Sequence, residues 1–168
     1  MGAILLEGRR VVGTACVDNP TDFIKRYNVD AKIVDFGESV ETVDSASRVA
    51  GVPPSDIVKT LLLVVDGRPM AVLLPGDKKL DYRKLSALTK ASKIRMASPD
   101  EIVELTSQMP GGLTPLSECI RGLKIIMDSS IASKERVWVG GGSPTALAEV
   151  RVADLVRALR PTLAEISQ

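Results

Sequence analysis

The chain has 168 residues, 45% of them hydrophobic and 26% charged, and its formal net charge is +1. These values fit one globular domain without an overall field that attracts nucleic acid, so any such contact has to be local. The chain contains no histidine and only two cysteines, which excludes Ser-His-Asp and Cys-His catalysis, imidazole zinc sites and thiolate metal cages. An enzyme of this composition has to use backbone donors, lysine, carboxylates or groups of its substrate, and we expect no metal and no cofactor.

The N-terminal stretch MGAILLEGRR has a four-residue apolar run and no small-residue cleavage pattern, so it does not predict a secretory signal peptide. The longest apolar runs, such as residues 61–65, are too short to span a bilayer. We therefore expect a cytoplasmic protein without membrane contact.

The first predicted elements after the N-terminus are a helix, a strand and a second helix. NPTDFIKRYNVDA predicts a short helix capped by Thr21 or Asp22, and KIVDF predicts a strand. SVETVDSASRVAGVPP carries apolar residues at helical spacing, with Gly51 as the C-terminal stop and Pro53 beyond it.

A β-hairpin is predicted in IVKTLLLVVDGRPMAVLLPGD. Two apolar runs flank Asp66-Gly67, a pair typical of tight hairpin turns. Because both runs are apolar on both faces, we expect these strands in the centre of a covered sheet.

Two further helices follow the hairpin. DYRKLSALTKAS predicts a helix with Leu85 and Leu88 facing inward. SPDEIVEL begins with a capping box, in which Ser98 caps the helix, Pro99 takes the first helical position and Glu101 follows three residues after the cap.

The C-terminal part predicts strands in LKIIMD, RVWVG and ALAEV, a glycine turn between the last two, and a closing helix near residues 153–159. Helices and hairpin-linked strands are interspersed without a regular βαβ repeat. This order predicts an α+β fold with a mixed or largely antiparallel sheet.

The stretch PGGLTP is a stiff loop with bare backbone, because Gly111 and Gly112 lie between Pro110 and Pro115. Glycine leaves backbone N–H groups uncovered, which suits a cradle for an oxyanion or phosphate. The alternative is a helix that ends in glycines followed by a turn.

Lys59 is a charged residue near the start of an apolar strand. By two-residue alternation it lies on the same face as Leu61 and Leu63. Its ammonium group either reaches solvent from the end of the sheet or projects into a pocket where its charge has a function.

Two other patterns are open between a binding role and a structural one. VWVGGGSP can bring backbone close to a ligand, but it lacks the Lys-Ser/Thr of a phosphate loop, and a hairpin turn explains it as well. A series of cations fits either a phosphate backbone or a solvated helical face. These cations are Lys78, Lys79, Arg83, Lys84, Lys90, Lys93 and Arg95.

Six motifs in this order resemble the YbaK/ProX family of aminoacyl-tRNA editing deacylases. They are VKTLLL, LLPGDKKLDYRKL, ASPDEIVELT, PGGLTPL, IIMDSSI and VWVGGGSP, and the resemblance covers about residues 21–166. It implies a single α+β domain over residues 21–168, with a curved, mixed and mostly antiparallel sheet flanked by helices. Residues 1–20 are then an N-terminal extension packed on that domain.

The resemblance also implies functional residues. Lys59 matches the family's functional lysine, and Gly111 and Pro115 match the ends of its GxxxP loop. The expected catalytic residues are Lys59, Gly111 and Gly112. One departure is Ser107, since a glycine is frequent there in the family. Substrate contacts are further expected from Thr42, Thr60, Leu113, Thr114, Pro115, Asp128, Gly140 and Gly141.

The implied activity is trans-editing, the hydrolysis of mischarged aminoacyl-tRNA that carries a small amino acid, with alanine or cysteine on tRNA(Pro) expected. An aminoacyl ester is already activated, so backbone donors, the strand lysine and the substrate's ribose hydroxyl suffice without histidine. The alternative is a non-catalytic module that binds aminoacyl-tRNA ends or nucleotides as an accessory protein of a tRNA synthetase. The expected partners are the acceptor end of mischarged tRNA and a synthetase.

Overall fold

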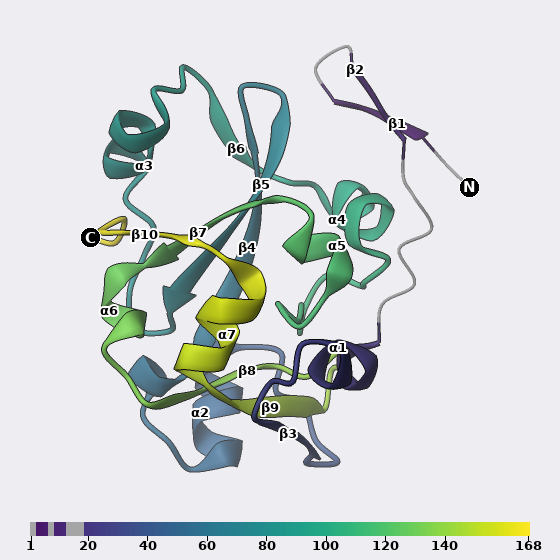
Figure 1. Cartoon of the computed structure of the whole chain (residues 1–168), viewed down its shortest axis with the longest axis vertical. Coiled ribbons are helices and arrows are strands. Elements are labelled where there is room, and N and C mark those ends of the chain that lie inside the picture. Colours follow the sequence, from purple (N-terminus) through teal and green to yellow (C-terminus); the bar gives the residue numbers. More distant parts are fainter. Residues whose placement is uncertain (1–2, 7–8, 13–18) are drawn as a thin grey trace.

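The computed structural model describes residues 3–6, 9–12 and 19–168. Its strands form a five-stranded sheet, a three-stranded sheet and an N-terminal hairpin, with helices between them (Figure 1). This arrangement confirms the predicted α+β fold.

The five-stranded sheet is built around the predicted hairpin. The antiparallel strands β4 and β5 lie at its centre, β6 pairs antiparallel with β4, and β7 pairs parallel with β5 and with β10. In spatial order the strands are β10 (Thr162–Ala164), β7 (Lys124–Asp128), β5 (Arg68–Pro75), β4 (Val58–Val65) and β6 (Ile94–Met96).

The hairpin turn has the geometry that its sequence predicts. Asp66 and Gly67 have φ values of 47° and 80°, and two consecutive residues with positive φ match the twist of the flanking strands. Both faces of β4 and β5 are covered, because Leu62 and Leu73 belong to one buried cluster and Leu63 to another.

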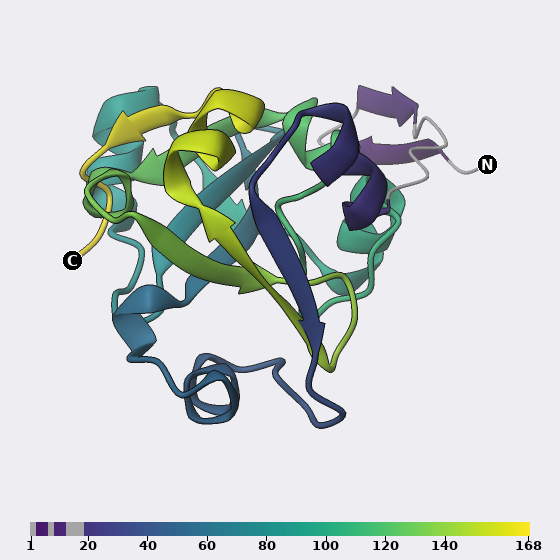
Figure 2. The ribbon, with the colours of Figure 1, turned by 60° about the horizontal axis from the view of Figure 1, so that its bottom comes forward.

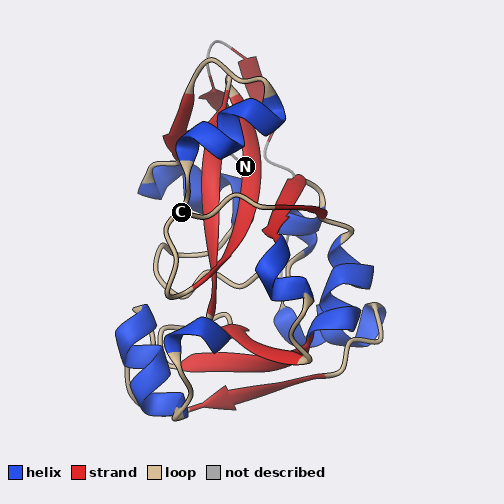
Figure 3. Cartoon of the chain, turned by 90° about the vertical axis from the view of Figure 1, so that its left-hand side faces the viewer, coloured by secondary structure: helices blue, strands red, loops and turns tan. Residues whose placement is uncertain are grey.

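A separate antiparallel sheet follows β3–β9–β8, where the sequence led us to expect one sheet. An isolated bridge between Ile57 and Trp138 joins the start of β4 to β8. In Figure 2 helices α1 and α7 lie on one side of this small sheet and α2 on the other, and Figure 3 shows it lying across the lower ends of the long strands. Its strands are β3 (Ala31–Asp35), β9 (Ala146–Arg151) and β8 (Arg136–Gly140).

The helices begin and end mostly where their capping residues predict. Ser98 and Glu101 form the predicted capping box, and Gly51 ends α2 in the left-handed conformation. The helices are α1 (Pro20–Arg26), α2 (Val43–Ala50), the 3-10 turn η1 (Pro54–Asp56), α3 (Tyr82–Thr89), α4 (Pro99–Thr106), α5 (Glu118–Arg121), α6 (Ser129–Ala132) and α7 (Val152–Leu159).

Two local predictions are wrong. Helix α1 is capped by Asn19, whose side chain accepts from the N–H of Thr21, and not by Thr21 or Asp22, because Pro20 is suited to the first helical position. Leu85 is fully buried, but Leu88 is 44% exposed, since it lies in the last turn of a two-turn helix and turns away from the sheet.

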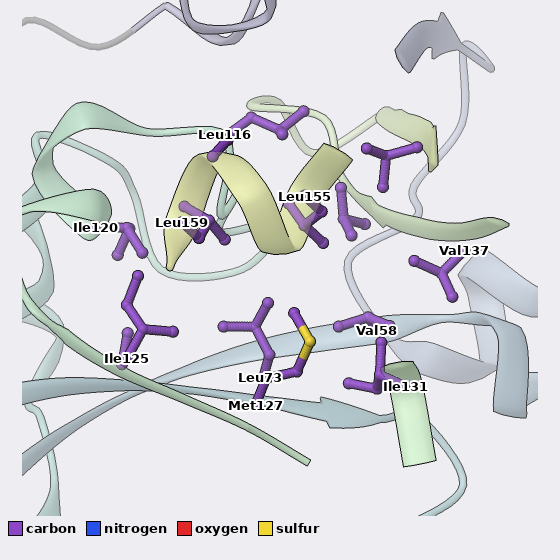
Figure 4. Packing of buried hydrophobic residues seen from close by; sticks show 14 of the residues in the cluster. Val58, Leu73, Leu116, Ile120, Ile125, Met127, Ile131, Val137, Leu155 and Leu159 are labelled. Atoms are coloured by element: carbon purple, nitrogen blue, oxygen red, sulfur yellow. The ribbon is translucent and has the colours of Figure 1, made fainter. Parts of the chain in front are cut away.

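The main core lies between α7, α5 and the two sheets. Figure 4 shows Leu155 and Leu159 of α7 above Leu73 and Met127 of the large sheet, and all four side chains are buried. This packing fixes the two sheets relative to each other.

The N-terminal hairpin pairs β1 (Ala3–Leu6) with β2 (Arg9–Val12), and β1 contacts α4. Residues 1–2, 7–8 and 13–18 lie outside the described residues. The prediction that residues 1–20 form an extension packed on the domain therefore stays a prediction. Within the described ranges, none of the helices has the length and apolar character needed to cross a membrane.

Candidate functional site

A cavity of about 270 Å³ opens where the N-terminal end of β4 meets the small sheet. Elements far apart in sequence form its walls: the start of β4, the segment before α2, the end of β8 and the glycine loop. Seven residues predicted as site residues line it, namely Thr42, Lys59, Thr60, Gly111, Gly112, Leu113 and Gly140.

One wall is the open edge of β4. The N–H of Ala97 donates to the Leu62 carbonyl at 2.9 Å, so the backbone groups of Leu62 face the side of β4 on which β6 lies. Because backbone groups alternate along a strand, those of Thr60 point to the same side. Strand β6 pairs only with Leu63 to Val65, which leaves Thr60 beside the cavity. The Thr60 hydroxyl is buried and has no hydrogen-bond partner within the described part of the chain.

Lys59 lines the same cavity from the start of β4. Partial burial lowers the pKa of its ammonium group below the ordinary lysine value, Asp77 opposes this change, and the nearby charge of Lys79 adds to it. No ion pair joins Lys59 to any carboxylate of the described residues. A partly buried cation that forms no ion pair with the described residues is suited to an anionic ligand such as a phosphate.

The opposite wall is the loop predicted from PGG. Gly111 and Gly112 have φ values of 85° and 75°, conformations that residues with a β-carbon rarely adopt. No described residue accepts a hydrogen bond from the N–H groups of Gly111, Gly112 or Leu113. These three consecutive N–H groups of a loop that lines the cavity are thus without an acceptor among the described residues.

A side-chain clamp holds the ends of this loop. Gln108 accepts from the N–H of Thr114 at 2.8 Å and donates to the Thr114 carbonyl at 3.1 Å. Thr106 accepts from the N–H of Gln108, and Ser107 adopts φ 57°, the conformation that the family's frequent glycine would favour there. The loop is therefore fixed at both ends, and its donors are oriented before a ligand binds.

Gly140 allows the loop to lie directly on β8. A β-carbon at Gly140 would lie 2.4 Å from the Leu113 carbonyl oxygen and 2.8 Å from that of Gly112. Behind the loop a second hollow of about 260 Å³ is lined by Met109, Pro144 and both glycines of the loop. The glycine loop is thus a thin partition with open space on either side.

Thr42 has a structural task as well as a place on the cavity wall. Its hydroxyl accepts from the N–H of Ser45 at 3.0 Å and donates to the Ser45 hydroxyl at 2.9 Å, which caps α2. A substrate contact from this hydroxyl would have to use its remaining lone pair.

Four expected contact residues are not brought to this cavity. Asp128 is 1% exposed, caps α6 and accepts from the N–H of Ile166 at 3.0 Å, so it fastens the C-terminal segment. Thr114 and Pro115 are buried at the clamped end of the loop. A β-carbon at Gly141 would collide with the backbone of Ala146, so this glycine serves packing.

The basic clusters are only partly paired. Lys84 forms an ion pair with Glu165, and Arg95 with Glu101. The other cations of the predicted series have no ion pair within the described ranges. Both interpretations of that series stay open.

Sequence reasoning missed two residues at the site. Gln108 is the clamp of the loop, and Glu41 lines the cavity next to Gly111. Neither belongs to a sequence pattern that predicts its position, because the role of each depends on the backbone that it faces after folding. No group of three or more potential metal ligands occurs among the described residues.

A family model described as the aminoacyl-tRNA editing domain matches residues 37–158. The chain belongs to this family. The match includes the start of β4, the glycine loop and the end of β8, and it confirms the resemblance found in the sequence motifs.

Curated relatives share part of this domain. The proline–tRNA ligase of Lactobacillus gasseri is 33% identical over 101 residues, 60% of this chain and 18% of the ligase. That of Geobacter metallireducens is 38% identical over 112 residues, 63% of this chain and 19% of the ligase. The chain therefore matches only about a fifth of the length of these relatives.

Solved structures match nearly the whole chain. The crystal structure of the hypothetical protein APE2540 has a TM-score of 0.80 at 31% identity and covers 88% of this chain and 98% of its own. That of a candidate trans-editing enzyme for prolyl-tRNA synthetase has a TM-score of 0.78 at 24% identity and covers 90% and 99%. Both have the fold described above.

Proposed function

We propose that the protein is a trans-editing hydrolase that deacylates mischarged aminoacyl-tRNA carrying a small amino acid, alanine or cysteine on tRNA(Pro). The observation that carries this proposal is the clamped loop with three available N–H donors, set across one cavity from Lys59. Membership of the editing-domain family and the similarity to proline–tRNA ligases support it. Since aminoacyl-tRNA is a substrate of translation, the proposed location is the cytoplasm.

In the proposed reaction the ester carbonyl lies against the loop. Water attacks the carbonyl carbon, and the N–H groups of Gly111, Gly112 and Leu113 stabilise the oxyanion that forms. One such donor typically contributes about 10²–10³ in rate. The bond to the ribose oxygen then breaks, that oxygen takes up a proton, and the free amino acid and the uncharged tRNA leave.

Lys59 binds the terminal phosphate or the ester region and fixes the geometry of the acyl group. The vicinal ribose hydroxyl of the substrate orients the attacking water, which compensates for the lack of histidine in the chain. The Thr60 hydroxyl, which is buried without a partner among the described residues, is a further hydrogen-bonding group for the bound end.

Selectivity for a small side chain follows from space. The cavity of about 270 Å³ has to hold the ribose and the ester as well as the side chain, and in this proposal its walls exclude larger side chains sterically. Discrimination between small side chains is weaker, since one methylene is worth only about 1–3 kcal/mol.

The second candidate is a binding module that holds aminoacyl-tRNA ends without turning them over and acts as an accessory protein of a tRNA synthetase. The same lysine and loop would serve it. Catalytic turnover separates the two functions.

The test is a deacylation assay with purified protein on tRNA(Pro) charged with alanine, cysteine or proline, and on tRNA(Ala) charged with serine or glycine. We expect many turnovers per protein on alanyl- or cysteinyl-tRNA(Pro), and none on prolyl-tRNA(Pro). Tight binding without turnover on the whole panel would favour the module instead.

A further inference from the structure

A carboxylate that belongs to no sequence motif lies against the glycine loop. Glu41 precedes the cap of α2 and lines the cavity. A β-carbon at Gly111 would lie 3.1 Å from Glu41 Oε1 and 3.5 Å from Glu41 Cδ. The side chain of Glu41 therefore covers the face of Gly111 that a larger residue would occupy.

This carboxylate has no cation of its own. No described residue forms an ion pair or a hydrogen bond with the Glu41 side chain. Glu38, three residues earlier, is paired with Arg48 at 3.4 Å. Lys59 lines the same cavity without forming an ion pair with Glu41, so one cavity presents an unpaired carboxylate and an unpaired ammonium group.

The charged end of an aminoacyl-tRNA has the complementary pattern. Its phosphates are anionic, and its free α-amine, two bonds from the ester carbonyl carbon, is cationic when protonated. If the N–H groups of residues 111–113 hold the carbonyl oxygen, the carboxylate over Gly111 lies on the wall next to the acyl group. An ammonium–carboxylate hydrogen bond there is charge-assisted.

We propose that Glu41 binds the α-ammonium group of the aminoacyl ester and thereby restricts the enzyme to esters with a free amine. The proposal rests on the proposed editing function and adds a subsite to it. Esters whose amine is acylated, as in peptidyl-tRNA, have no positive charge to offer this carboxylate and are bulkier at the same position. They are therefore poor substrates.

The test compares alanyl-tRNA(Pro) with its N-acetylated form on the wild type, Glu41→Gln and Glu38→Gln. The first substitution removes the charge at the cavity, and the second removes a similar charge that is paired outside it. Glu41 is exposed and makes no side-chain hydrogen bond with the described residues, so Glu41→Gln should fold normally, which a thermal melt checks.

We expect the wild type and Glu38→Gln to prefer the free amine by about 10- to 100-fold in kcat/KM, the range of a charge-assisted hydrogen bond. Glu41→Gln should lose most of this preference through a higher KM for alanyl-tRNA, with the N-acetylated ester unaffected. An unchanged preference in Glu41→Gln would overturn the proposal. So would an equal loss of kcat on both esters, because that result assigns Glu41 to water activation.

A binding measurement separates this subsite from the editing function. The probes are 3′-deoxy-3′-alanylamido-adenosine, which cannot be hydrolysed as an ester, and its N-acetylated form. Preferential binding of the free amine by the wild type, lost in Glu41→Gln, supports the subsite even if no ester is turned over. Equal binding of both probes by the wild type contradicts the subsite, whether or not deacylation is observed.

Discussion

Two hollows at opposite ends of β4 contain similar residues but differ in their free hydrogen-bonding groups. The hollow at the hairpin turn is the larger, about 490 Å³ against about 270 Å³. Each is lined by a lysine, Lys124 or Lys59, and by a glycine with positive φ, Gly67 or Gly111.

At the hairpin the polar groups of Asp66 are used by the fold. The N–H of Asp66 donates to the Lys93 carbonyl at 2.8 Å, and the Asp66 carboxylate accepts from the N–H groups of Ser92 and Lys93. At the other end the donors of residues 111–113 have no partner among the described residues. A run of three consecutive backbone donors without acceptors, rather than volume or charge, distinguishes the candidate site.

The largest expected effect comes from replacing the lysine of each hollow by alanine. Lys59→Ala should lower kcat/KM for alanyl-tRNA(Pro) by about 10²-fold, because the acyl group loses the cation that positions it. Lys124→Ala, its control at the larger hollow, should leave kcat/KM unchanged. Equal losses in both variants would mean that the lysines act through a general attraction for tRNA.

The two ends should also separate under glycine substitution. Gly140→Ala places a β-carbon 2.4 Å from the Leu113 carbonyl oxygen, so it should destabilise the fold by about 1–3 kcal/mol and displace the loop. We expect deacylation to fall by about 10²-fold. Gly67→Ala is strained by its φ of 80°, so it should lower the free energy of unfolding by about 1–2 kcal/mol. Its deacylation activity should be unchanged. Urea unfolding and kcat/KM measured on the same preparations check both variants.

Loosening the clamp should have a smaller effect. Gln108→Ala removes both hydrogen bonds to Thr114, which should lower kcat by about tenfold through poorer positioning of the donors. Single-turnover deacylation measures this step without product release. If the rate is unchanged, the loop keeps its conformation without Gln108.

Thr60→Val should separate binding from stability. The hydroxyl it removes is buried and has no partner in the part of the chain that the structure describes, so the free energy of unfolding should stay constant or rise by up to about 1 kcal/mol. Affinity for the alanylamido-adenosine probe should fall by about 3- to 10-fold if the hydroxyl bonds the ligand. A drop in stability would show that this hydroxyl contributes to the fold.

The smallest effect concerns the helix that leads into the loop. Arg95 donates to both carboxylate oxygens of Glu101, at 2.6 Å and 3.0 Å, and this lowers the pKa of Glu101 from 4.5 to about 2. Because the pKa of Glu101 is lower in the folded state, its carboxylate stabilises the fold at pH values above the ordinary pKa of 4.5. This stabilisation is lost as the pH falls from 4.5 to about 2. Glu101→Gln should cost on the order of 1 kcal/mol at pH 7, because the pair is partly exposed. Urea unfolding at pH 7 and pH 3 should show a smaller difference from the wild type at pH 3.

Local chemistry explains what could be predicted from the sequence. The Asp66-Gly67 turn, the Ser98 capping box and the Gly51 helix stop depend on neighbouring residues, and all three are confirmed. Strands β6 and β10 have three residues each and form by pairing with strands distant in sequence. They are too short for a periodic pattern to predict them. Leu88 shows the limit of helical spacing in a helix of two turns.

The site was predictable to the extent that its residues lie in motifs. Lys59 and the glycine loop were found in this way, and the fold brings them to one cavity. Glu41 and Gln108 could not be predicted, because their roles depend on which backbone they face after folding. Asp128 was expected at the substrate, but its carboxylate is used by the C-terminal segment.

The most direct test of the account is an amide NMR titration of the full chain with 3′-deoxy-3′-alanylamido-adenosine. We predict the largest chemical-shift changes at the N–H groups of Gly111, Gly112 and Leu113, with Gly67 unaffected. Changes concentrated around Gly67 and Lys124 instead, or spread evenly over both ends of β4, would contradict the assignment of the site.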